Sequence, residues 1–98
     1  MEKEVTQAQI DEWKVKYGDV FCIEVDGKIV YLRKPDRKAL SAAAIVGKSD
    51  PIKYNEILLK NCWLAGDEEI KTNDDLFLGV SGKLSGIIEI KEAELKKL

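Results

Sequence analysis

The chain has 98 residues, of which 45% are hydrophobic and 35% are charged, a composition that predicts one globular domain spanning residues 1–98 with a modest core. Its formal net charge of −2 argues against a dedicated nucleic-acid-binding protein, because such proteins usually carry a basic excess. Histidine is absent, which excludes Ser–His and Cys–His catalytic pairs and removes the commonest metal ligand.

The sequence favours a soluble protein of the cytoplasm. The segment MEKEVTQAQ is polar and acidic, unlike a signal peptide. No apolar run approaches the roughly 20 residues that a membrane-spanning helix requires. Cys22 and Cys62 lie in apolar runs without CxxC spacing, so we expect both to be reduced and buried.

A short amphipathic helix is predicted first along the chain. Thr6 and Gln9 have the spacing of a capping box, in which each side chain binds a free backbone N–H at the helix start. Gly18 is suited to ending the helix. One apolar stripe follows the helical period and consists of Ile10, Trp13 and Tyr17.

Residues 20–25 and 28–34 predict a β-hairpin. Asp26 and Gly27 between them favour a type I′ turn, which sets a register that pairs Val25 with Lys28. One face of the hairpin is then a good core face, formed by Phe21, Ile23, Val30 and Leu32.

The opposite hairpin face is too apolar to be fully exposed to water. Its members are Val20, Cys22, Glu24, Ile29, Tyr31 and Arg33. We expect another element of the chain, or a second subunit, to cover part of it. Within it we select as the candidate partner-binding site Cys22, Ile29, Tyr31 and Arg33.

Two helices are expected after the hairpin. Pro35 ends the second strand, and Asp36 is a plausible cap for an alanine-rich helix that runs to about residue 48. Asp50 and Pro51 mark the start of a second helix that runs to about residue 64, with Gly66 as its stop. Because apolar residues cover most of this second helix, we expect it to lie at the centre of the core.

The last third of the chain is less regular. Residues 67–73 form an acidic connector, and Thr72 or Asn73 is positioned to cap a helix that contains several glycines. Residues 87–90 fit either a continuation of that helix or a short third strand, and residues 92–98 resemble a charged helical tail. The overall prediction is an α+β fold with an N-terminal helix, a β-hairpin and three to four packed helices.

Three patterns have possible chemical roles, each with a simpler structural explanation. Acidic residues around 67–75 suggest a cation site or an acid–base pair, but they lack the EF-hand spacing, and a solvated connector explains them better. Residues 79–86 contain glycines and a lysine, yet their spacing differs from a phosphate-binding loop. A basic patch suggests a phosphate or acidic partner, although edge protection is the simpler explanation; it comprises Lys28, Arg33, Lys34, Arg37 and Lys38.

The two tryptophans lie on apolar stripes. Trp63 is predicted to pack in the core, whereas Trp13 fits either core packing or an interface anchor. No residue of either stripe suggests catalysis, and no cofactor is expected.

Several segments together resemble a known family. EWKVKYGDVF, the DG hairpin, YLRKPDRKALSAA, DPIKYNEILLKNCWLAGDEEI and KEAELKKL are similar to small tail assembly chaperone-like proteins of tailed phages and prophages, in particular those of Bacteroides-type bacteria. The resemblance implies a small, often oligomeric α+β protein that holds the tape-measure protein during tail assembly.

The functional expectation is therefore a non-enzymatic assembly chaperone of the bacterial host cytoplasm. Its expected partners are a tape-measure-like client and further copies of itself, with no cofactor, nucleic acid or membrane. The alternatives are a small structural tail adaptor, an uncharacterised protein-interaction module of a prophage, or a small enzyme that uses the acidic connector with a metal.

Overall fold

The structure, a computed structural model, describes residues 5–88 and 93–98 and combines helices with a three-stranded antiparallel sheet, which confirms the α+β class. The sheet consists of β1 (Val20–Val25), β2 (Lys28–Arg33) and β3 (Trp63–Gly66), with β2 in the centre. The helices are α1 (Gln7–Tyr17), α2 (Arg37–Val46), α3 (Pro51–Cys62), α4 (Glu69–Thr72), α5 (Asp74–Leu84) and the 3₁₀ helix η1 (Ser85–Ile87).

Side-chain caps begin four of these helices where the sequence predicts them. The Thr6 hydroxyl accepts a hydrogen bond from the Gln9 N–H at 3.2 Å, and the Gln9 side chain accepts one from the Thr6 N–H at 3.0 Å, which completes the capping box of α1. Asp36, Asp50 and Asn73 likewise accept backbone N–H groups in the first turns of α2, α3 and α5.

The hairpin register is as predicted. Val25 pairs with Lys28, and the alternate pairs along the strands follow from it. Asp26 and Gly27 have φ values of 47° and 76°, which fit the positive φ that a type I′ turn needs at both positions. The predicted core face is therefore directed towards the helices, and Val30 and Leu32 are fully buried.

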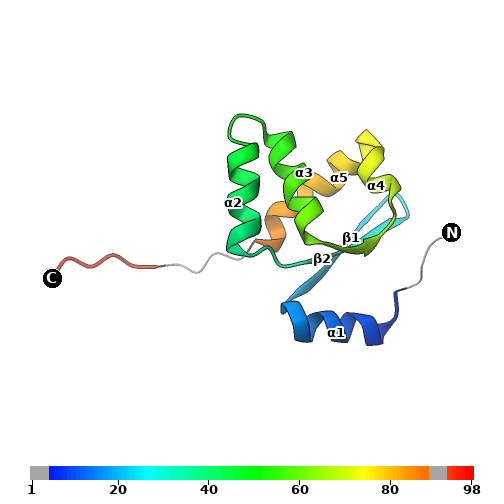
Figure 1. Cartoon of the computed structure of the whole chain (residues 1–98), viewed down its shortest axis with the longest axis horizontal. Coiled ribbons are helices and arrows are strands. Elements are labelled where there is room, and N and C mark those ends of the chain that lie inside the picture. Colours follow the sequence, from blue (N-terminus) through cyan, green and yellow to red (C-terminus); the bar gives the residue numbers. More distant parts are fainter. Residues whose placement is uncertain (1–4, 89–92) are drawn as a thin grey trace.

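The core lies between one face of the sheet and helices α2, α3 and α5 (Figure 1). Leu58 of α3 and Leu84 of α5 are almost fully buried against the hairpin residues, which confirms the central position of α3. Some apolar residues of α3 are nevertheless accessible to solvent. Ile52 in its first turn, for example, is 51% exposed. Helix α1 lies on the opposite side of the sheet (Figure 1).

The third strand, β3, lies where the sequence predicts the end of a helix and not at residues 87–90. The sequence predicts helix to about residue 64, but α3 ends at Cys62 and the next four residues pair with β2. The pairing places Gly66 so close to β2 that an added Cβ would lie 2.6 Å from the Ile29 carbonyl oxygen, at a φ of 154°. Gly66 thus allows two backbones to approach rather than ending a helix.

The end of the chain also differs from expectation. Residues 93–98 form no regular secondary structure, so the predicted helical tail is wrong over this range, and Leu95 is fully exposed. Leu98 has no apolar surface to pack against, and an amphipathic helix without a partner is marginal at this length. Ile87 closes η1 and Ile88 is extended, whereas the rest of the predicted segment 87–90, and residue 92, lie outside the described residues.

Two smaller boundaries shift as well. Helix α2 ends at Val46 rather than near residue 48, and the predicted acidic connector contains the short helix α4.

Within the described ranges, no helix combines the length and the apolar character that crossing a membrane requires.

Candidate protein-binding surface

The second hairpin face is covered in part by helix α1. Trp13 of α1 packs against Tyr31 of β2 with ring centroids 6.0 Å apart and an interplanar angle of 45°. Tilted aromatic pairs at this separation are attractive. Part of the cover that the apolar face requires therefore comes from the chain itself, and Trp13 acts as an anchor between elements rather than as a core residue.

Arg33 joins α1, β2 and the following helices at one end of this face. Its guanidinium lies 5.5 Å from the centre of the Tyr17 ring, and its Nε donates a hydrogen bond to the Asn61 carbonyl oxygen at 3.2 Å. Its Nη1 lies 3.5 Å from the Asp36 Oδ2. Because the Arg33 side chain is only 23% exposed, most of its charge is already directed at groups of the chain.

Cys22 remains exposed, so the prediction that both thiols are buried is wrong for this residue. Partial loss of water around the sulfur and, to a smaller degree, the Glu24 carboxylate nevertheless raise the pKa of the Cys22 thiol above its ordinary value. Cys62 is fully buried in the core as predicted, and burial raises the pKa of its thiol to about 11. Both cysteines are free thiols.

Ile29 lies towards the turn of the hairpin, where the chain after β3 returns to β2. Its N–H donates to the Asp67 carboxylate at 3.3 Å, and its carbonyl oxygen accepts the Asp67 N–H at 3.0 Å. Its side chain is half-buried. The structure thus distributes the four predicted residues along one face, with Tyr31 and Arg33 against α1 and Cys22 exposed to solvent.

Helix α1 is attached through few contacts. None of its residues is buried, and Val15 on its outer side is 89% exposed. Tyr31 and Ile29 stay half-buried although α1 lies on their face of the sheet. The covered face therefore retains accessible apolar surface, which a second protein segment can contact.

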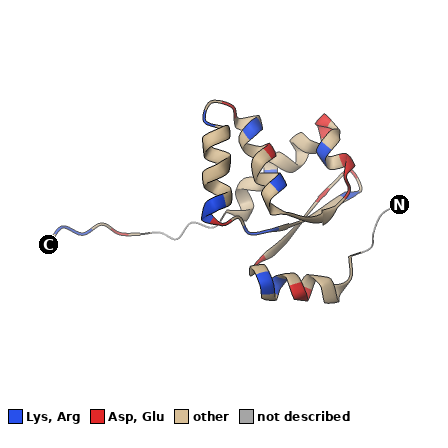
Figure 2. Cartoon of the chain, in the orientation of Figure 1, with Lys and Arg blue, Asp and Glu red and all other residues tan. Residues whose placement is uncertain are grey.

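A cavity of about 410 Å³ opens where the end of α1 meets the start of α2. It is lined by Lys16, Tyr17, Arg33, Lys34, Pro35 and Asp36. This cavity contains part of the predicted basic patch, and Figure 2 shows basic residues along the ribbon from β2 into α2. Lys28 is not part of this group, because it lies at the other end of the hairpin, 3.8 Å from the Glu69 carboxylate.

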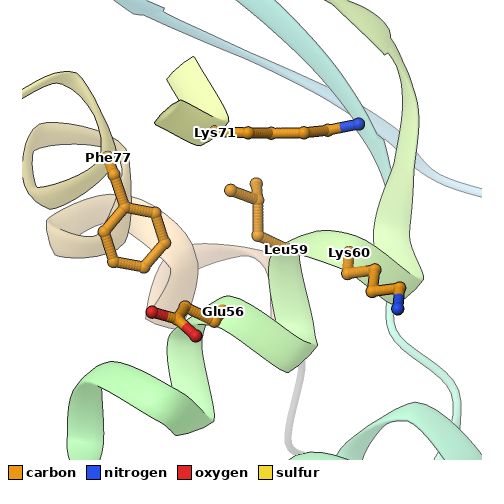
Figure 3. A pocket seen from close by; sticks show the side chains of 5 residues that line it. All are labelled: Glu56, Leu59, Lys60, Lys71 and Phe77. Carbon is orange, nitrogen blue, oxygen red and sulfur yellow. The ribbon is translucent and has the colours of Figure 1, made fainter. Parts of the chain in front are cut away.

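A second cavity, of about 320 Å³, lies between α3, α4 and α5 (Figure 3). Leu59 and Phe77 form its apolar part, and Glu56, Lys60 and Lys71 supply the charged side chains around it. Sequence reasoning missed this site because Leu59 and Phe77 fit a core assignment, and the position of α4 depends on the unpredicted strand β3.

The predicted acidic segment is distributed among structural contacts. Asp67 binds the Ile29 backbone, Glu68 pairs with Lys71 at 2.9 Å, and Glu69 pairs with Lys28. Lys71 also lies 4.1 Å from the centre of the Trp63 ring, and Trp63 is half-buried against the core. In the part of the chain that the structure describes, no three Cys, Asp or Glu side chains are arranged to hold a metal ion.

Comparisons of the chain with protein-family models, with curated proteins and with solved structures found no match.

Proposed function

We propose that the chain is a non-enzymatic, tail assembly chaperone-like protein that binds a tape-measure-like client in the cytoplasm of a bacterial host. The family resemblance of the sequence supports this proposal. The α+β fold with an N-terminal helix and a β-hairpin is compatible with it.

The observation that carries the proposal is the incomplete cover on the second hairpin face. Helix α1 has no buried residue, Tyr31 beneath it is half-buried, and Ile29 on the same face of the sheet is also half-buried. Protein-binding surfaces use aromatic residues as anchors, and Trp13 and Tyr31 are of this type.

The chemistry of the face favours an amphipathic protein segment as the client. Ile29, Tyr31 and Trp13 offer apolar and aromatic surface, and the basic residues around the cavity at Arg33 offer hydrogen-bond donors at one end. An amphipathic helix that places its apolar stripe on this face and an acidic end near Arg33 satisfies both groups. A long tape-measure protein supplies many such segments.

Co-purification with a tape-measure protein that is co-expressed with this chain tests the proposal. We expect the wild-type chain to be retained by the client, and Tyr31→Glu to reduce retention by roughly tenfold or more, because loss of an aromatic anchor costs over ~1.4 kcal/mol of binding. Val15→Glu is the matched control, since it adds the same carboxylate at a position that is 89% exposed on the outer side of α1.

Circular dichroism and thermal unfolding of both variants establish that the hairpin and helices persist. Failure of the wild-type chain to co-purify, or equal retention of Tyr31→Glu and Val15→Glu, contradicts the proposal. Detection of the chain in purified virions by mass spectrometry favours the structural adaptor instead, because an assembly chaperone is absent from the finished particle.

A further inference from the structure

Strand β1 forms one edge of the sheet, and its outer side has no strand partner in the described part of the chain. Val25 and Lys28 flank a two-residue turn, so the two residues of this pair exchange both backbone N–H···O=C hydrogen bonds. The pairs Ile23–Val30 and Phe21–Leu32 do the same. The hydrogen bond from the Lys34 N–H to the Asp19 carbonyl oxygen, 3.1 Å, continues the same alternation.

The intervening residues consequently direct their backbone groups away from β2. These residues are Val20, Cys22 and Glu24. Each presents one N–H and one C=O at the outer edge of β1, in the pattern that another antiparallel strand recognises.

The two edges of the sheet differ in how they are protected. Strand β3 has four residues, ends at Gly66, and pairs with β2 through an irregular register between Tyr31 and Leu32, all of which discourage further pairing. Strand β1 has six residues, VFCIEV, with no proline, no lysine and no bulge. Its one charged side chain is Glu24, so β1 has only a single one of the sequence devices that normally keep an edge strand unpaired.

We propose that β1 pairs antiparallel with β1 of a second copy of this chain, with Cys22 opposite Cys22 of the partner subunit. The two sheets join into one six-stranded sheet, and the cores of both copies lie on the same face of it. This inference does not depend on the proposed client, because it concerns the edge of the sheet and not the face beneath α1.

The edge is complementary to itself in this register. Val20 lies opposite Glu24 of the partner subunit, and Phe21 lies opposite Ile23 of the partner subunit, which continues the apolar core face across the junction. The two Glu24 residues are four positions apart along the strands, roughly 13 Å. A change of register that places Glu24 opposite Cys22 of the partner subunit brings the two Glu24 carboxylates to about 7 Å apart along the strands. Repulsion between these like charges disfavours that register.

Sedimentation equilibrium of the full chain tests the pairing with two variants at one position. Glu24→Thr keeps the outward N–H and removes the charge, so we expect the dimer to persist. Glu24→Pro removes that N–H from each copy but no hydrogen bond of the hairpin, so we expect the dissociation constant to rise by roughly thirtyfold or more. Circular dichroism checks that both variants keep the wild-type content of strand and helix.

Cross-linking of the wild-type chain gives a second measurement that needs no proline variant. A short bismaleimide is expected to join the two Cys22 thiols into a covalent dimer, because opposed Cα atoms in such a pair lie about 5.5 Å apart. Cys62 is buried and does not compete in the native chain, and Cys22→Ser is the control that should lose the product.

Three results overturn the inference. One is a wild-type chain that sediments as a monomer at every concentration tested. Another is a dimer whose dissociation constant is the same for Glu24→Pro and Glu24→Thr. The third is a dimer that yields no cross-link through Cys22.

Discussion

At the scale of single residues, Asp36 links secondary structure to the surface around Arg33. Its carboxylate accepts the Ala39 N–H at 2.8 Å as the cap of α2, and its other oxygen lies 3.5 Å from Arg33. The hydrogen bond from Ala39 is the main reason that the pKa of Asp36 is below its ordinary value, and the charges of Arg33 and Lys38 lower it further. The ionised form is therefore favoured more in the folded chain than in the unfolded one.

This lowered pKa predicts an acid-dependent loss of stability. The stabilisation by Asp36 is complete above the ordinary carboxyl pKa of 3.8 and disappears as pH falls through the lower pKa of the folded chain. Asp36→Asn keeps a good helix cap but cannot titrate, so we expect its free energy of unfolding to decline less between pH 4 and pH 2 than that of the wild type. Urea unfolding at a series of pH values measures this difference, and parallel pH profiles for the two chains would exclude the role of Asp36.

At the scale of elements, helix α5 depends on how closely it approaches β1. A Cβ added at Gly79 would lie 2.9 Å from the Cγ2 of Val25, whereas one at Gly82 meets nothing within 4 Å. The two glycines are three residues apart on one helix but have different surroundings. The same substitution at each position therefore separates packing from helix propensity.

We expect opposite effects of alanine at these two positions. Gly82→Ala should raise the free energy of unfolding by up to ~1 kcal/mol, because alanine restricts the unfolded chain and fits the helix. Gly79→Ala should lower it by ~1 kcal/mol or more, because Val25 is stiff and the contact forces α5 and β1 apart. Chemical denaturation of both variants measures the difference, and a similar gain at both sites would mean that the α5–β1 contact yields easily.

Local signals account for most elements, and tertiary contacts account for the ones that the sequence does not reveal. Thr6, Asp36, Asp50 and the Asp26–Gly27 turn act within a few residues of themselves, so their roles could be predicted. Strand β3 could not, because its four residues are extended through pairing with β2 and a hydrogen bond between Asp67 and Ile29, 38 residues apart. The same limit applies to the candidate surface. The alternation of the hairpin predicts its residues, but its cover by α1 depends on the contact between Trp13 and Tyr31.

At the scale of the whole molecule, the sheet separates two layers of different character. On one side α2, α3 and α5 bury the core residues, and on the other α1 buries none of its own (Figure 1). The two layers should therefore differ in local stability.

Hydrogen exchange is expected to reveal this difference. Amides of α1 should exchange faster than those of α3 and α5, because opening α1 exposes little buried apolar surface while opening the others exposes the core. Exchange followed by mass spectrometry on short peptides resolves the layers, and the α3 peptide that contains Leu58 is the internal reference. Equal protection of α1 and this peptide would show that α1 unfolds only together with the core.

The positions of the two indoles give each layer its own optical signal. Trp13 lies between α1 and Tyr31, whereas Trp63 lies on β3 beneath the ammonium group of Lys71. With one indole replaced by phenylalanine, the emission of the other reports on the terminal helix or on the core layer alone. The chain therefore contains two intrinsic fluorophores that distinguish release of α1 from loss of the whole fold.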